Sequence, residues 1–347
     1  MVKQQRKRFY GLLLLICLIL GSASVQTHLA QQQSPLSTSI PYDEIIHQGI
    51  LDGGIEQQDS QGRSSFLSKL ERWYSSHPLI EFASLVGTSI TVKFIDGSYI
   101  VILDPLQRKN EYIIDPPSSF LHERYGIVKD KSALLLNTAE YMYGHRQCQN
   151  IIATLLRHEY SIEYLANEAV DLSYLRHNLS ADIIYMNTHA GYFDVDGDHQ
   201  ADAVVIATGE FWTNETEQKY AFDYQNKLIV KGMVGNQGFV AFTPAFIDYY
   251  YVPGDFPDSL VFMATCFATY DASMAQEFLD AGASVYMGWS QNTIFWTNSK
   301  TSVNSFRLLA NGLTAQQVCK LIGSGGFYNW LFHSKLIYYG DGEHRIP

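Results

Sequence analysis

The segment "DIIYMNTHAG", residues 182–191, places a histidine directly after an uninterrupted apolar run. Four similar runs surround it: "SALLLNTA" at 132–139, "YSIEYLANE" at 160–168, "SLVFMATC" at 259–266 and "ASVYMGWS" at 283–290. Each run has the length of a strand but lacks the polar-apolar alternation of a sheet with one wet face. These runs therefore predict strands that are buried on both faces.

The segments between these runs have the apolar spacing of helices. They are "RQCQNIIATLLRH" at 146–158, "DLSYLRHNL" at 171–179 as a short helix or turn, "DASMAQEFLDAG" at 271–282, "SVNSFRLLANG" at 302–312 and "TAQQVCKLIG" at 314–323. Three of them end in glycine, a common residue at a helix terminus. Strands that alternate with helices predict an α/β fold in which helices flank a mostly parallel sheet. Ligand sites in such sheets lie beyond the carboxyl ends of the strands.

The start of the chain is typical of a secretory signal peptide, which we place at residues 1–23. It has a basic beginning, an apolar stretch and then small residues. The apolar stretch is shorter than the ~20 residues that cross a bilayer. We therefore expect a secreted or extracytoplasmic protein with no stable membrane anchor once the signal is removed.

The rest of the chain divides into two predicted regions. Residues 24–126 form a polar tail and a small α+β region, with a helix in "SSFLSKLERWYSS" at 64–76 and a hairpin in "SITVKFIDGSYIVILD" at 89–104. The hairpin turns at Asp96-Gly97, a dipeptide suited to tight turns. Residues 127–347 form the main α/β domain.

Charge and cysteine content narrow the function further. The formal net charge of −11 argues against nucleic acid as a partner, because phosphates attract clustered Lys and Arg. Cys17 leaves with the signal, so Cys148, Cys266 and Cys319 remain, too few for a disulfide scaffold. Cys148 and Cys319 lie in predicted helices, where we expect core residues, whereas Cys266 lies at a strand end.

His189 and Cys266 close two predicted strands of one sheet and so lie at the same edge. A histidine beside a thiol can act as its base and stabilise the thiolate that attacks a carbonyl. We expect the backbone N–H groups of Gly191 and Cys266 to stabilise the resulting oxyanion. The pair thus predicts nucleophilic catalysis.

Residues 131–347 resemble the caspase-fold cysteine peptidases, most closely the gingipain-like branch. The matching segments are "NTHAG" at 187–191, "MATCFA" at 263–268, "FLDAGASVYMGWSQNTIFW" at 278–296 and "YYGDGEHRIP" at 338–347. The resemblance implies a three-layer caspase-like fold and a protein or peptide substrate, with His189 as general base and Cys266 as nucleophile.

It also implies a specificity loop at 288–299, with Trp289 and Trp296 as pocket walls and Ser290, Gln291 and Asn292 as lining. Residues 24–126 would be a zymogen's pro-segment or an accessory domain, with Arg108-Lys109 as a processing point.

Two departures from the family keep other functions open. Ala190 stands where the family has a glycine after the histidine, and "MATCFA" lacks the Gln-Ala-Cys pattern of caspases. No preference for aspartate is therefore implied. The alternatives are a non-catalytic extracellular calcium-binding protein that retains the fold, and another thiol hydrolase that uses the same pair.

The segment "DVDGDHQAD", residues 194–202, carries Asp194, Asp196, Asp198 and Asp202 at its positions 1, 3, 5 and 9. Hard oxygen ligands in a tight loop with a glycine are typical of calcium sites. His199 occupies a position where such loops usually have glycine. A zinc site of His189, Asp194 and His199 is a weaker alternative, because it lacks a helical i, i+4 pair.

Overall fold

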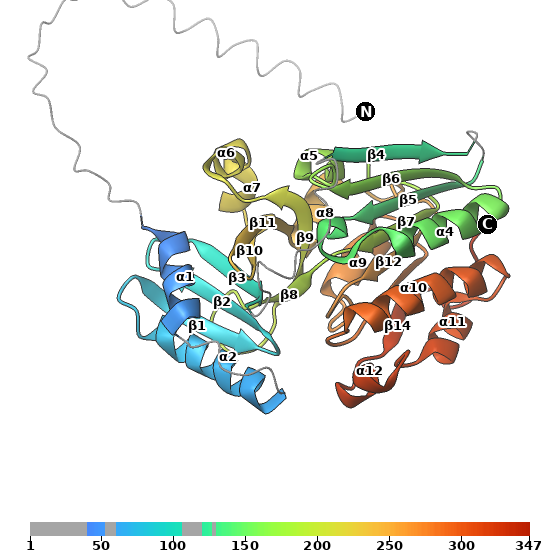
Figure 1. The fold of residues 1–347 in the computed structure, drawn as a ribbon. Helices are drawn as coiled ribbons and strands as arrows, with labels where there is room; N and C mark the ends of the chain where they lie inside the picture. Colours follow the sequence, from blue (N-terminus) through green and yellow to red (C-terminus); the bar gives the residue numbers. More distant parts are fainter. Residues whose placement is uncertain (1–39, 53–59, 106–119, 127–129) are drawn as a thin grey trace, which may run out of the picture. The chain divides into compact units, whose positions relative to one another are not determined.

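Two seven-stranded sheets organise the residues described by this computed structural model, which are 40–52, 60–105, 120–126 and 130–347 (Figure 1). The predicted signal peptide, Cys17, the tail up to residue 39 and the Arg108-Lys109 pair lie outside these ranges. Residues 42–347 form one structural unit. The fold is a mixed α/β structure.

Sheet B contains the apolar runs of the sequence. Its strands, in spatial order, are β14 (Leu336–Gly340), β13 (Val285–Trp289), β12 (Leu260–Ala264), β7 (Ile183–Asn187), β5 (Ser132–Asn137), β6 (Ser161–Asn167) and β4 (Phe120–Tyr125). The five central strands are parallel, and the two outer strands are antiparallel to their neighbours. The prediction of a mostly parallel α/β sheet is confirmed.

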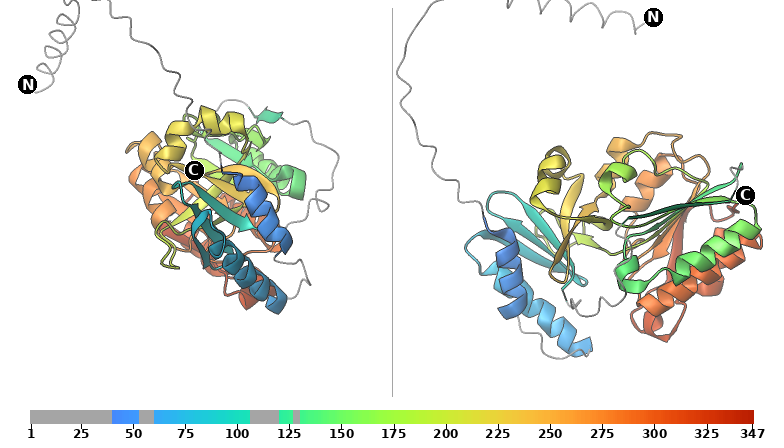
Figure 2. Two further views of the ribbon diagram at one scale, coloured as in Figure 1. Left: turned by 90° about the vertical axis from the view of Figure 1, so that its left-hand side faces the viewer. Right: turned by 45° about the horizontal axis from the view of Figure 1, so that its top comes forward.

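Helices cover both faces of sheet B. On one face lie α4 (Arg146–Arg157), α10 (Phe295–Ala310) and α11 (Ala315–Ile322), with α4 beside α10 (Figure 2). On the other lie α5 (Leu172–Leu175), α8 (Pro244–Tyr250) and α9 (Ser273–Asp280), together with part of sheet A. Both faces of the sheet are therefore buried. In β5, for example, Leu134 belongs to one hydrophobic core and the adjacent Leu135 belongs to the other. Burial of both faces explains why these strands do not alternate.

The remaining helices are shorter or lie beside sheet A. They are α1 (Tyr42–Asp52), α2 (Ser60–Ser75), α3 (Glu140–Tyr143), α6 (Asn214–Lys219), α7 (Ala221–Gln225) and α12 (Phe327–Leu331). Within the described ranges, no helix has the length and apolarity needed to cross a membrane.

Sheet A joins the N-terminal strands to strands that follow His189. Its order is β1 (Ile80–Val86), β2 (Ser89–Phe94), β3 (Tyr99–Asp104), β10 (Ile229–Val234), β11 (Gln237–Phe242), β9 (Ala203–Phe211) and β8 (Ala190–Phe193). The β2–β3 hairpin confirms the predicted turn, where Gly97 has a φ of 88°. Because β3 pairs in parallel with β10, the N-terminal strands do not form a sheet of their own.

The two edges of sheet A approach each other. The backbone N–H of Tyr192 in β8 donates to Ser89 Oγ in β2 at 3.2 Å, and the N–H of Asp194 donates to Thr91 Oγ1 at 3.1 Å. These side-chain bonds curve the sheet into a nearly closed, barrel-like form. The chain after His189 is thus held against the N-terminal strands.

Gly209 is a point of close contact between the sheets. A Cβ at this β9 position would lie 1.7 Å from the backbone oxygen of Asn167, which ends β6. Backbone atoms cannot give way as a flexible side chain can. We therefore predict that Gly209→Ala lowers the free energy of unfolding by about 1–3 kcal/mol or more.

Denaturant unfolding of the purified protein measures this effect, with Gly326→Ala as the matched control. A Cβ at Gly326 would have its nearest neighbour at 3.5 Å. We expect the control to change stability by less than about 0.5 kcal/mol. Equal effects from the two substitutions would contradict this account of the contact.

Candidate active site at the edge of sheet B

The strands that carry His189 and Cys266 are neighbours in sheet B. β7 and β12 pair in parallel, and Asn187 at the end of β7 is the Cα partner of Ala264 at the end of β12. His189 and Cys266 each lie two residues beyond this matched pair, and both are partly exposed. The structure therefore places the two residues at equivalent positions on adjacent strand ends.

The segments after these two strands also remain in contact. The ring of Tyr192, three residues after His189, lies 4.3 Å from that of Phe267 and 4.4 Å from that of Tyr270, measured between centroids. Cys266 packs against the cluster formed by Val86, Tyr192 and Phe267. The chain segments that follow the two strands thus pack against each other.

The backbone around Cys266 orients its sulfur. The N–H of Thr293 donates to the Cys266 Sγ at 3.3 Å, and the carbonyl oxygen of Thr293 lies 3.5 Å from the same atom. An N–H directed at sulfur stabilises negative charge on a thiolate. Phe267, the next residue, has a φ of 59°, which is unusual for a bulky side chain and often marks a functional site.

The two other described cysteines have different surroundings. Cys148 in α4 and Cys319 in α11 are buried, and none of the three described cysteines forms a disulfide. Burial raises the pKa of the Cys148 thiol and raises the pKa of Cys319 to about 12. Both are core residues, as their helical positions predict. Cys266 is the more accessible thiol of the three.

The imidazole of His189 lies beside an aromatic pair. Its Nε2 is 3.5 Å from the hydroxyl of Tyr143, whose ring stacks on Phe295 at 4.4 Å. Partial burial lowers the pKa of His189, because it disfavours the imidazolium, while the carboxylate of Asp104 opposes this shift. This shift favours the neutral imidazole, which is the form that a general base requires.

Asp104 was not identified from the sequence. It ends β3, far from His189 in the sequence, so its influence depends on β3 lying beside β8, the strand that begins directly after His189. The preceding residue, Leu103, packs against Gly191, where an added Cβ would lie 2.7 Å from the Leu103 Cδ2. A strand end that follows an apolar run is the only sequence signal that could have marked it.

A buried asparagine network connects the strand ends below the site. Asn187 Nδ2 donates to Asn137 Oδ1 at 2.8 Å, and Asn298 Nδ2 donates to the carbonyl of Ala264 at 2.9 Å and to Asn187 Oδ1 at 3.3 Å. The network ties β5, β7 and β12 to α10. Its sequence signal is the asparagine that closes both "SALLLN" and "DIIYMN".

The expected pocket residues lie in different environments. Trp289 is fully buried, and its Nε1 donates to Asn298 Oδ1 at 2.9 Å, whereas Trp296 is 76% exposed in the first turn of α10. The other three residues each accept one hydrogen bond. Ser290 Oγ accepts from the N–H of Lys335, and the carbonyl of Gln291 accepts from the N–H of Phe267. Asn292 Oδ1 accepts from the Thr88 hydroxyl. Trp289 is thus a core residue that supports the loop.

Gly191 has a packing reason to be glycine. It is buried in β8, where it pairs with Val205, and a Cβ would lie 2.3 Å from Ser89 Oγ. The small residue allows β8 to approach β2. Its expected role as an oxyanion donor stays a prediction.

The acidic loop brings three of its four aspartates together. Asp194, Asp196 and Asp202 each offer a carboxylate oxygen within 4.8 Å of the others, and Asp198 is not part of this group. Asp194 is buried and accepts bonds from the N–H groups of Gly197 and His199. His199 has the positive φ, 64°, that such loops usually assign to glycine. Neither histidine of the zinc alternative belongs to the group.

We predict that His189 titrates below its ordinary value of 6.5. Removal of the Asp104 charge in Asp104→Asn takes away the stabilisation of the imidazolium, so the midpoint should fall further. NMR titration of the imidazole signals measures both midpoints, with His189→Gln for assignment. Asp280→Asn, a change at an exposed residue of α9, should leave the midpoint unchanged. A wild-type midpoint at or above 6.5 would contradict the prediction.

Comparison with known proteins identifies no relative of this chain. No protein-family model, no curated protein and no solved structure matches the chain. The likeness to caspase-fold peptidases rests on the short motifs quoted above. What the geometry contributes is an imidazole and a thiol at neighbouring strand ends.

Proposed function

We propose that the chain is a cysteine endopeptidase that acts outside the cytoplasm and uses His189 and Cys266 as a catalytic dyad. The observation that carries this proposal is the pairing of Asn187 with Ala264, which sets the two residues at equivalent positions on adjacent strands. The lowered pKa of His189 and the N–H directed at the sulfur support it. A caspase-like arrangement of sheet B and its helices belongs to the same proposal.

In the proposed reaction, the His189 imidazole takes the proton of the Cys266 thiol. The thiolate attacks the carbonyl carbon of the scissile peptide, and the backbone N–H groups of Gly191 and Cys266 are the proposed donors to the oxyanion. The imidazolium then gives its proton to the leaving amine, which breaks the C–N bond. Water, deprotonated by His189, hydrolyses the thioester and restores the thiol.

The N-terminal region fits an accessory role better than that of a removable pro-segment. Strands β1, β2 and β3 belong to sheet A, and β3 pairs directly with β10. Removal of residues 24–126 would expose the edge of β10 and take Asp104 away from His189. We therefore propose that any processing leaves these strands with the main domain.

We also propose that calcium binds the loop through Asp194, Asp196 and Asp202. Three carboxylates so close together repel each other unless a cation lies among them. The loop begins one residue after β8, so the ion would stabilise the segment that follows His189 and Gly191. Its role would be structural or regulatory.

One observation favours the non-catalytic alternative. Gly191 is enclosed between β9 and Ser89, so its conformation has a packing explanation that needs no substrate. A binding protein that kept the fold and the calcium loop would retain this glycine as well. In that case the dyad residues would be present but would turn over neither peptides nor esters.

We predict that Cys266→Ala and His189→Gln each reduce peptide hydrolysis by roughly 10³-fold or more, as loss of a nucleophile or its base does in related chemistry. Release of fluorescent fragments from labelled casein, with calcium present, measures the rate. Cys319→Ala is the matched control, since its buried thiol is expected to have no catalytic role. A Cys266→Ala protein as active as wild type would overturn the proposal.

If the wild-type protein does not hydrolyse peptides, ester hydrolysis and thiol labelling distinguish the two alternatives. Ester hydrolysis that depends on Cys266, without peptide hydrolysis, would assign the same dyad to another thiol hydrolase. Loss of both activities, together with slow alkylation of Cys266 by iodoacetamide at pH 7, would favour the binding protein.

Calcium should raise the thermal stability of the protein through the three grouped aspartates. Saturation at 100 times the dissociation constant contributes about 2.7 kcal/mol. Asp196→Asn and Asp202→Asn should abolish the calcium-dependent rise in Tm, whereas Asp198→Asn should retain it, because Asp198 lies outside the group. The same Tm with calcium and with chelator in the wild type would refute calcium binding.

A further inference from the structure

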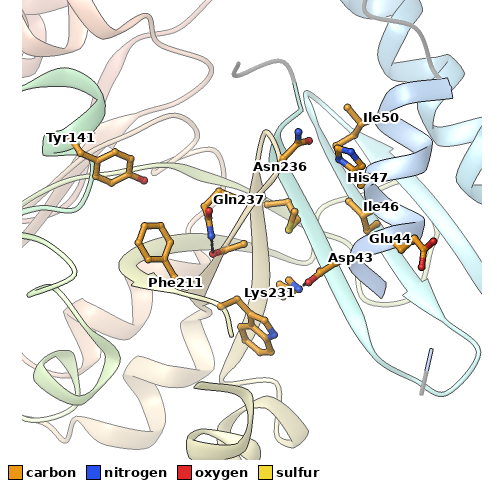
Figure 3. Close-up of a pocket in the computed structure, with 13 residues that line it drawn as sticks. Asp43, Glu44, Ile46, His47, Ile50, Tyr141, Phe211, Lys231, Asn236 and Gln237 are labelled. Atoms are coloured by element: carbon orange, nitrogen blue, oxygen red, sulfur yellow. Dashed lines mark hydrogen bonds and ion pairs between the residues drawn. The ribbon is translucent and has the colours of Figure 1, made fainter. Parts of the chain in front are cut away.

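A pocket of about 750 Å³ lies between α1 and the β10–β11 hairpin, with Tyr141 of α3 on its other side (Figure 3). Its apolar lining comes from Ile46, Ile50, Tyr141, Phe211, Trp212 and Met233. Neither His189 nor Cys266 lines it. The volume is in the range of sites for small organic ligands.

A buried lysine gives this pocket its polar anchor. The side chain of Lys231 in β10 is 7% exposed, and its ammonium pairs with the carboxylate of Asp43 in the first turn of α1. Gly238 on the adjacent strand makes room for it, because a Cβ there would lie 2.9 Å from Lys231 Cε. The sheet is therefore shaped around the lysine stem.

The ammonium of Lys231 has donor capacity beyond this pair. It carries three N–H donors, and the contact with Asp43 is the single hydrogen bond that it makes with described residues. The remaining donors can bind a further acceptor, and a carboxylate is a strong one. Asn236 and Gln237 add amide groups to the same wall.

Charge at the pocket limits the class of ligand. Asp43 and Glu44 line it from exposed positions on α1, so a polyanion such as a nucleotide would be repelled. A ligand with one carboxylate can pair with the Lys231 ammonium while its apolar body packs against the aromatic side chains. Asp43 already occupies the lysine in the way that such a carboxylate would.

We propose that this pocket binds a compound with a single carboxylate on an aromatic or aliphatic body, with Lys231 as its anchor and Asp43 as an internal competitor. The ligand is either a free acid or the C-terminal residue of a peptide, since the two present the same chemistry. The site is independent of the dyad, so Cys266→Ala should leave binding unchanged.

Calorimetry on the full chain with N-acetyl-phenylalanine, and with its amide as the matched probe, tests the proposal. We expect the acid to bind at least roughly tenfold more tightly than the amide, the margin of a charge-assisted bond. Lys231→Met should remove this difference, and Lys219→Met, a change at an exposed lysine, should retain it. Peptides that end in phenylalanine, with a free or an amidated C-terminus, distinguish a chain end from a free acid.

Asp43→Asn provides a second variant that does not depend on the folding of Lys231→Met. The Asp43 side chain is 72% exposed, so its loss should be tolerated, and the acid should bind more tightly because the competitor is gone. Equal affinities for acid and amide in both wild type and Asp43→Asn would overturn the proposal. The proposal would also be overturned if neither the acid nor the amide bound to the wild type or to Asp43→Asn.

Discussion

The parallel register between β7 and β12 is the constraint on which the candidate site depends. It pairs Asn187 with Ala264, and His189 and Cys266 each follow this pair by two residues. A slip by one residue would direct every side chain of a strand to the opposite face, which two buried cores do not allow. The asparagine network reinforces this register, because its donors and acceptors match only when the strand ends are level.

His189 lies where the chain passes from one sheet to the other. The carbonyl of Asn187 accepts a bond from the N–H of Thr138, the residue after β5 of sheet B, and the carbonyl of His189 accepts one from the N–H of Ala207 in sheet A. These bonds fix the backbone around His189. This position also brings His189 near β3, because β3 lies beside β8, and the Asp104 carboxylate at the end of β3 favours the imidazolium.

The sequence predicts sheet B well because most of its strands are uninterrupted apolar runs, which can be identified without knowledge of their partners. Sheet A was largely missed, since glycines interrupt β8, β9, β10 and β11 and its strands pair across large separations, as β3 does with β10. The buried lysine of β10 illustrates the difficulty. A lysine in a sequence usually indicates a solvent-exposed position. Lys231 is nevertheless buried, because Gly238 leaves room for its side chain and Asp43 pairs with its ammonium.

The sequence by itself determined the five parallel strands, the helices between them and the strand-end positions of His189 and Cys266, because these follow from local periodicity. It also marked the acidic loop through the spacing of its aspartates. Only the tertiary structure decided which aspartates group together, that Asp104 acts on His189 and that Trp289 is a core residue. Those outcomes depend on contacts between residues far apart in the chain, which no local pattern encodes.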